Sequence, residues 1–215
     1  FLIEREQSVL SKLIAIGGAM EEESFEIQIK VRIEDPQPIF DALEKSNIQI
    51  LRKRHYREYD TFFSFEDSDE GYLRFREDQF LNEQNEMTNV RSRLTLIGTP
   101  EYNYPQEVLL SRSRYYAPAV HSLRFYREYF KPSSEREVEK DRRRYLVSYK
   151  DTEFFINIDD IKKPDLGKFL EVKSRTWSRQ DANRKAALAT ELIEFLGASP
   201  AETTSSDYFE MVKSL

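Results

Sequence analysis

Residues 25–34, FEIQIKVRIE, alternate strictly between apolar and polar side chains. Apolar side chains occupy the odd positions from Phe25 to Ile33, and charged or amide side chains occupy the even positions from Glu26 to Glu34. A period of two predicts a β-strand with one buried face. For a single strand the usual interpretation is that the polar face meets water. A row of charged side chains along one face also suits a binding site. The polar faces of the later strands distinguish a solvated face from a binding site.

Seven further segments have strand character and are separated by turn sequences such as EDSDEG, GTPEYNYP and KKPDLG. They are residues 56–65, 72–77, 89–98, 106–116, 138–149, 153–159 and 168–175. Eight antiparallel strands are enough to close a small barrel. We therefore predict an α+β fold, an eight-stranded antiparallel β-barrel (a tunnel) with flanking helices. The alternative is an open antiparallel sheet with helices on one face.

Helical patterns flank these strands. Residues 35–47 and 121–130 suit short helices, and 178–197 suits a long one that starts with a capping box of Ser178 and Asp181 and ends at Gly197. Residues 207–212 suit a small edge strand or a last helical turn. We expect residues 1–19 to form an N-terminal helical extension ahead of Met20, a natural start and the first residue of a 20–215 tunnel domain.

The amino-acid composition limits the kinds of ligand and metal site that the chain can form. Lys and Arg number 33 against 39 Asp and Glu, a net charge of −6, so the overall charge disfavours a long nucleic acid as partner. The chain has no cysteine and two histidines, which excludes thiolate sites and argues against zinc. A bound metal would be a hard cation on oxygen ligands, such as Mg²⁺ or Mn²⁺. No apolar run approaches the ~20 residues that span a bilayer, and we expect a cytoplasmic protein without a membrane partner.

Arginine dominates the polar faces of the later strands. The residues concerned are Arg74 and Arg76 in 72–77, Arg91 and Arg93 in 89–98, Lys140, Arg142 and Arg144 in 138–149, and Lys173 and Arg175 beside Glu171 in 168–175. Arginine is suited to bidentate recognition of phosphate oxygens. If these faces point inward, like charges repel strongly in the enclosed space. A polyanion, with a divalent cation on the carboxylates, would relieve that repulsion.

Four motifs resemble one known family in the same order along the chain. EIQIK (26–30) resembles its Glu-x-Glu-x-Lys signature, and YDTFFSFEDSDEGYLRFRE (59–77) resembles its Asp-Thr-Tyr-Phe strand followed by Leu-x-x-Arg-Glu. RLTLIG (93–98) resembles its Leu-Thr-x-Lys-Gly strand, and INIDDIKKPDLGKFLEVKS (156–174) resembles its closing Leu-Asp-x-Val, Leu-Gly and Phe-x-Glu-Ile-Glu motifs. The family is the CYTH superfamily, also called triphosphate tunnel metalloenzymes, and the resemblance covers roughly residues 20–212.

The resemblance implies a tunnel in which Lys and Arg grip a triphosphate while acidic residues hold Mg²⁺ or Mn²⁺. The phosphate-binding residues it implies are Lys30, Arg32, Arg74, Arg76, Arg93, Arg142 and Arg144. The metal ligands it implies are Glu26, Gln28, Asp159 and Glu171, with a structural turn as the alternative role for Asp159. The substrate would be a small molecule such as ATP, thiamine triphosphate or tripolyphosphate, and a homodimer is plausible.

Three positions depart from the family pattern. Gln28 and Lys173 stand where carboxylates are usual, and Ile97 stands where a lysine is usual. Hard cations depend on carboxylate charge, so these changes weaken the metal site. We expect a metal-dependent enzyme that hydrolyses a triphosphate or cyclises ATP. The alternative is a non-catalytic module that binds a nucleotide or polyphosphate. RNA 5′-triphosphate processing is disfavoured by the net charge.

Overall fold

The computed structural model describes residues 7–99, 108–110 and 112–215, and ten antiparallel strands of this part of the chain form one sheet. The spatial order is β1-β7-β5-β4-β3-β8-β9-β10-β2-β6. In chain order the strands are β1 (Ala19–Met20), β2 (Phe25–Ile33), β3 (Gln49–Ser64), β4 (Tyr72–Leu81), β5 (Met87–Ile97), β6 (Val108–Leu110), β7 (Ser113–Pro118), β8 (Ser134–Tyr149), β9 (Thr152–Lys163) and β10 (Asp165–Thr176). The helices are α1 (Val9–Ala15), α2 (Gln37–Leu43), α3 (Leu123–Phe130), α4 (Arg179–Phe195) and α5 (Tyr208–Lys213), with a 3₁₀ turn at Pro200–Glu202.

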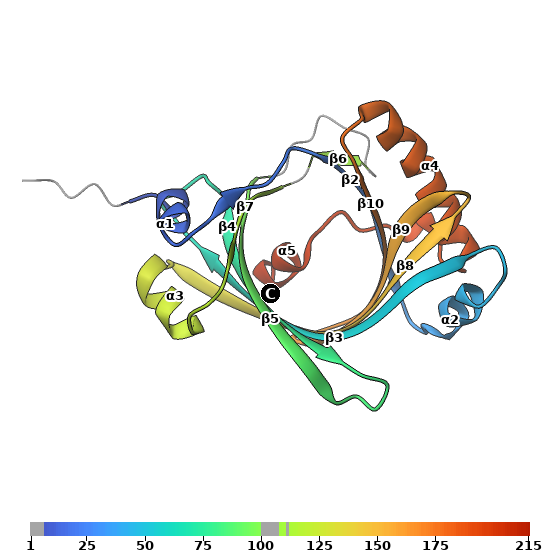
Figure 1. The fold of residues 1–215 in the computed structure, drawn as a ribbon, viewed down its shortest axis with the longest axis horizontal. Helices are drawn as coiled ribbons and strands as arrows, with labels where there is room; N and C mark the ends of the chain where they lie inside the picture. The colour runs from blue at the N-terminus through green and yellow to red at the C-terminus, as the bar shows by residue number, and fades with distance from the viewer. Residues whose placement is uncertain (1–6, 100–107, 111) are drawn as a thin grey trace, which may run out of the picture.

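The sheet bends into a deep trough, and α5 lies inside the curve while α1, α2, α3 and α4 lie outside it (Figure 1). The α+β class and the tunnel-like antiparallel sheet are confirmed, and the eight strands of six residues or more correspond to the eight predicted strands. Between the two edge strands, β1 and β6, no ladder joins the described residues, so the sheet is open there. The predicted strand 106–116 divides into β6, which pairs with β2, and β7, which pairs with β5. Residues 106, 107 and 111 lie outside the described part.

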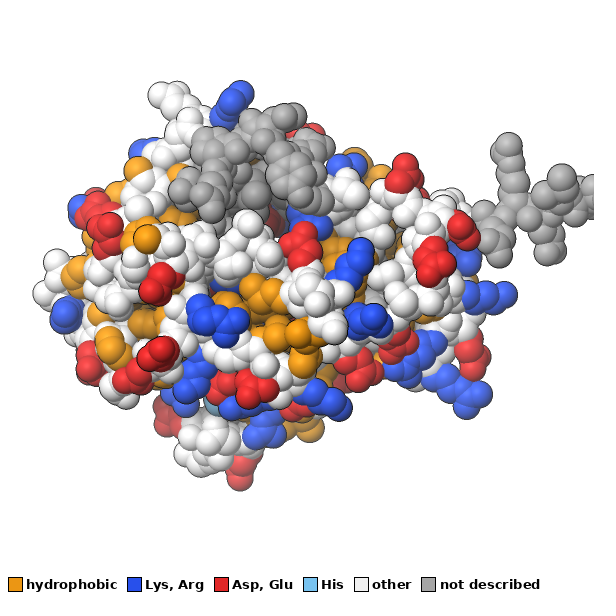
Figure 2. All heavy atoms as spheres, turned by 180° about the vertical axis from the view of Figure 1, so that it is seen from behind, with side chains coloured by type: hydrophobic (Ala, Val, Ile, Leu, Met, Phe, Trp, Pro, Cys, Tyr) orange, Lys and Arg blue, Asp and Glu red, His pale blue; other side chains and the backbone are white. Residues whose placement is uncertain are grey.

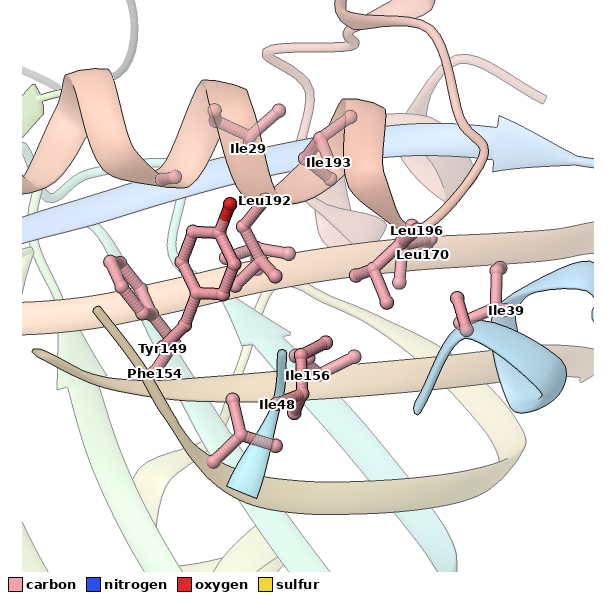
Figure 3. Packing of buried hydrophobic residues seen from close by; sticks show 14 of the residues in the cluster. Ile29, Ile39, Ile48, Tyr149, Phe154, Ile156, Leu170, Leu192, Ile193 and Leu196 are labelled. Atoms are coloured by element: carbon pink, nitrogen blue, oxygen red, sulfur yellow. The ribbon is translucent and has the colours of Figure 1, made fainter. Parts of the chain in front are cut away.

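Helices cover the apolar outer face of the sheet, and this turns the polar faces inward. Behind β2, β9 and β10, the side chains of Leu192 and Ile193 from α4 pack on Ile29 and Leu170, all of them buried (Figure 3). Burial of each such side chain stabilises the fold by about 1.5–3 kcal/mol. A second cluster packs α1 and α3 on β4, β5 and β7. Because side chains alternate along a strand, the residues between these anchors face the trough.

The start of α4 differs from the sequence pattern, and α5 settles the two alternatives for residues 207–212. Ser178 caps α4 by accepting a hydrogen bond from the Asp181 backbone N–H, but the backbone N–H of Ser178 donates to Thr176 Oγ1, so the predicted reciprocal box does not form. A full capping box forms instead at α5, between Asp207 and Glu210. Residues 207–212 are therefore helical, the second of the two alternatives. Among the described residues, no helix is long and apolar enough to cross a membrane.

The N-terminal helix is packed onto the sheet. Val9 and Leu13 of α1 are buried in the cluster with α3, and Tyr129 Oη donates to the Lys12 carbonyl oxygen. The helix ends before Gly17, whose positive φ of 95° is a conformation that glycine adopts without strain. Residues 9–20 thus contribute contacts to the same fold as the strands that follow.

Candidate functional site: a cationic cavity inside the trough

A cavity of about 250 Å³ lies on the concave side of the sheet, between the strands and α5. Its lining includes nine cationic side chains, namely Lys30, Arg74, Arg76, Arg93, Arg112, Lys140, Arg142, Arg144 and Lys173. Four carboxylates also line it, namely Glu26, Asp60, Glu171 and Asp207. Acidic and basic side chains are intermixed over the face of the molecule that Figure 2 shows. The cavity lining thus carries an excess of positive charge, in a chain whose net charge is −6.

Strand register brings these charges together. Asp60 on β3 is paired with Arg76 on β4, and Arg76 is paired in turn with Arg93 on β5. On the other side, Lys30 on β2 is paired with Glu171 on β10. Directly paired side chains on one face of a sheet lie about 4.5–5.5 Å apart at Cβ, which places charged groups within contact distance.

One buried network is centred on the carboxylates of β3. Arg76 holds Asp60 in a two-pronged pair, with Nε 2.5 Å from Oδ1 and Nη2 2.7 Å from Oδ2. Lys140 lies 2.9 Å from a Glu58 oxygen and 3.3 Å from an Asp60 oxygen. Burial opposes ionisation of Asp60, but the charges of Arg76 and Lys140 outweigh it and lower the pKa of this carboxyl. Glu58 and Asp60 are therefore held as carboxylates between protein cations.

A second buried network joins β8, β9 and α5. Arg142 binds Asp159 through two hydrogen bonds of 2.6 Å, and Tyr208 Oη donates to the same carboxylate at 2.6 Å. Burial raises the pKa of Tyr208, and the neighbouring negative charges raise it further, so the phenol stays protonated and donates. These bonds fasten α5 to the trough and fix the floor of the cavity.

Glu171 lies at the centre of the lining. Its Oε1 accepts a hydrogen bond from Asn157 Nδ2 at 2.9 Å, and its Oε2 lies 3.8 Å from Lys30 Nζ. Burial disfavours the charged form of Glu171, but Lys173, Lys30 and Arg142 outweigh it and lower its pKa. Burial likewise lowers the pKa of Lys30, with the charge of Glu171 acting against the shift.

Four cations of the lining have no carboxylate within 4 Å in the described part of the chain: Arg74, Arg93, Arg144 and Lys173. The Nε atoms of Arg74 and Arg93 are buried and have no hydrogen-bond partner. Burial and the charge of Arg76 lower the pKa of Arg74, and the same causes lower the pKa of Arg93 to about 10. A buried donor nitrogen without a partner is costly. These side chains are set to receive an anion.

The structure brings most of the predicted site residues together. Six of the seven predicted phosphate-binding residues line the cavity, namely Lys30, Arg74, Arg76, Arg93, Arg142 and Arg144. Arg32 does not join them, because its exposed side chain donates to the Leu166 carbonyl oxygen at 2.5 Å and lies over the Phe169 ring. Of the predicted metal ligands, Glu26, Gln28 and Glu171 line the cavity, while Asp159 is fully buried beneath Arg142.

The residues present do not fit the metal site that the resemblance implies. Within the described ranges, no three Asp, Glu, His or Cys side chains are grouped to hold a metal ion. Glu26 lies 3.1 Å from Arg175, and Asp159 is bound by Arg142. Arg142 also stands between Asp159 and Glu171, at 3.8 Å from the latter. Protein cations take the places between carboxylates that a divalent ion would need.

Several residues of the cavity and of the buried network beside it were not predicted as ligands. Asp60 was matched in the resemblance without a role, and Lys140 lies on the cationic face of the predicted strand 138–149. Glu58 shares a strand face with Asp60, which was a usable signal in the sequence. Asp207 and Tyr208 had no such signal, because only the return of α5 into the trough places them there.

Comparison with known proteins supports the fold. No protein-family model matches the chain, and no curated protein sequence matches it significantly. The PH1819 protein of Pyrococcus horikoshii is similar in structure with a TM-score of 0.62 and 16% identity, over 88% of this chain and 98% of that one. A "putative adenylate cyclase" from Vibrio parahaemolyticus gives a TM-score of 0.60 and 14% identity, over 89% and 99%. The chain shares its fold with these structures, and the likeness is consistent with the resemblance of its sequence motifs to the CYTH superfamily.

A third similar structure is described in terms of an activity. It is an adenylyl cyclase candidate from Hippeastrum with a reported dominant triphosphatase activity, with a TM-score of 0.53 and 13% identity, over 89% of this chain and 95% of that one. Identities of this size establish the shared fold. The chemistry of this protein depends on the residues of its own cavity.

Proposed function

We propose that this protein binds the triphosphate group of a small molecule, such as ATP, thiamine triphosphate or tripolyphosphate, inside the trough. The observation that carries the proposal is the set of four cations around one cavity that have no carboxylate partner among the described residues, two of them with buried unpaired Nε atoms. A triphosphate supplies oxygen acceptors in a row, which matches guanidinium donors projecting from neighbouring strands. Binding also compensates the desolvation of these cations, which is the cost that lowers their pKa values.

The fixed network explains how such an anion would be positioned. Arg76 and Arg142 are each held by a carboxylate through two hydrogen bonds, so their remaining N–H groups keep a defined direction. Arg144 is oriented by a hydrogen bond from its Nε to Asn157 Oδ1 at 2.8 Å. A preorganised set of donors loses less conformational entropy on binding than flexible surface side chains would.

A second candidate function is turnover of the bound triphosphate, by hydrolysis or by ATP cyclisation, with Mg²⁺ or Mn²⁺ as cofactor. The descriptions of two structural neighbours as adenylate cyclase candidates favour it. Binding is placed first because each carboxylate of the buried networks is already held by a Lys or Arg. None of these carboxylates is free to accept a proton from a water or hydroxyl nucleophile without breaking an ion pair.

Calorimetric titration with tripolyphosphate, ATP and thiamine triphosphate tests the proposal directly. We expect all three to bind, and Arg93→Gln to weaken binding by about tenfold or more, because one charge-assisted hydrogen bond is worth about 1.5–3 kcal/mol. Arg124→Gln is the control, since Arg124 is exposed on α3 and pairs only with Glu128 among described residues. Equal affinities of Arg93→Gln and wild type would contradict the proposal.

The second candidate is tested on the same samples. Release of phosphate is measured with each triphosphate, and formation of cyclic AMP with ATP, in the presence of added Mg²⁺ or Mn²⁺. Product above the level of an Arg93→Gln sample would establish turnover, and binding without product would establish a receptor. The predicted homodimer is tested separately, by measuring the molar mass with light scattering during size-exclusion chromatography.

A further inference from the structure

The facing strands β2 and β10 place six side chains in three rows on the cavity side. The register pairs Glu26 with Arg175, Gln28 with Lys173, and Lys30 with Glu171. The outer rows each join one acid to one base, and the middle row joins an amide to a lysine. The two acids stand at opposite corners of this grid.

In this arrangement the carboxylates of Glu26 and Glu171 are too far apart to bind one metal ion. Glu26 on β2 and Glu171 on β10 lie four residues apart along the ladder, about 13 Å at 3.3 Å per residue. Mg²⁺ holds its oxygen ligands at about 2.1 Å in octahedral geometry, so a single ion does not reach both. Lys173 lies between them, and it has no carboxylate within 4 Å among the residues that the structure describes.

Elsewhere around the cavity, protein cations lie between pairs of carboxylates. Lys140 contacts both Glu58 and Asp60, and Arg142 lies between Asp159 and Glu171. The positive charge of Lys173 acts on its neighbours, because it lowers the pKa of both Glu171 and Lys30. In both of these described pairs of carboxylates, a Lys or Arg lies where a bridging cation would lie.

We propose that the cavity binds a triphosphate without a divalent cation, with Lys173 supplying the positive charge between β2 and β10 that the metal supplies in the family pattern. The inference rests on the proposed function. A free Mg²⁺ ion then competes with the protein for the phosphate oxygens instead of assisting binding, because the ion and the protein cations neutralise the same charge.

Calorimetry of tripolyphosphate in two buffers tests this, one with EDTA and one with millimolar MgCl₂. We expect the affinity in EDTA to equal or exceed the affinity in MgCl₂. Tighter binding in MgCl₂ by about tenfold or more, equivalent to 1.4 kcal/mol, would overturn the inference while leaving the proposed function intact. No binding in either buffer would overturn both.

Two variants and one direct measurement complete the test. Lys173→Met and Lys173→Gln should each weaken tripolyphosphate binding in EDTA by about tenfold or more, as expected for one lost charge-assisted contact. Lys162→Met is the matched control, because Lys162 is largely exposed on β9 and pairs with Asp160. Unchanged affinity of both Lys173 variants would overturn the inference. Electron paramagnetic resonance of added Mn²⁺ should show only the free ion, and a bound spectrum that Glu171→Gln removes would equally overturn it.

Discussion

Replacing Arg74 by methionine should stabilise the protein and weaken its binding of triphosphate at the same time. Arg74 projects from β4 into the cavity, its Nε is buried without a partner, and no carboxylate lies within 4 Å in the described chain. Burial and the charge of Arg76 lower its pKa. The unsatisfied Nε and the repulsion from Arg76 both destabilise the folded protein without an anion. Both are removed when an apolar side chain of similar length replaces the guanidinium.

The size of both effects, on stability and on binding, follows from the loss of the Arg74 guanidinium. An unsatisfied buried donor costs about 1–3 kcal/mol, so the free energy of unfolding should rise by about that amount. For a chain of 150–250 residues this raises Tm by about 2–4 °C per kcal/mol. Loss of one charged donor to a phosphate oxygen removes about 1.5–3 kcal/mol of binding, a factor of about 10–150 in Kd.

Urea unfolding and calorimetric titration with tripolyphosphate measure the two effects on one preparation. Arg124→Met provides the control, because the Arg124 side chain is 86% exposed and its pair with Glu128 lies on the surface of α3. Exposed pairs of this kind contribute about 0–1 kcal/mol, so both quantities should stay near wild type. The reasoning is refuted if Arg74→Met unfolds at lower urea and binds tripolyphosphate as wild type does.

Three further changes probe the rest of the framework. Arg142→Met should lower the free energy of unfolding, measured by urea denaturation, by about 3–5 kcal/mol, because it leaves the buried Asp159 carboxylate without its cation. An unchanged free energy of unfolding would show that the pair is not desolvated. Leu192→Ala should cost about 2–5 kcal/mol by opening a cavity in the cluster under α4, with tripolyphosphate affinity preserved in the folded variant. The pKa of Asp60 is lower in the folded chain than its ordinary 3.8, so the unfolded chain binds more protons in acid and stability falls as the pH drops below about 4. Asp60→Asn should flatten that fall when unfolding is followed against pH, and an unchanged slope would contradict the assigned shift.

The sequence alone determined the strands and their two faces. In FEIQIKVRIE the alternation predicts β2 and its polar row, and the structure places Ile27, Ile29 and Val31 against the outer helices. The long helix α4 was equally readable, because its apolar residues recur at helical spacing and Gly197 follows its end. These features depend on contacts between near neighbours in the chain and on one apolar face per element.

Only the tertiary structure decided what the polar rows do. Register between strands distant in sequence pairs Gln28 with Lys173 and separates Glu26 from Glu171, and no local pattern encodes that register. The same applies to Arg32, which shares the alternation of Lys30 but lies beyond the cavity against Leu166. Long-range pairing follows from the packing of the whole sheet on its helices, where burial of the apolar faces outweighs the cost of gathering like charges on the concave side.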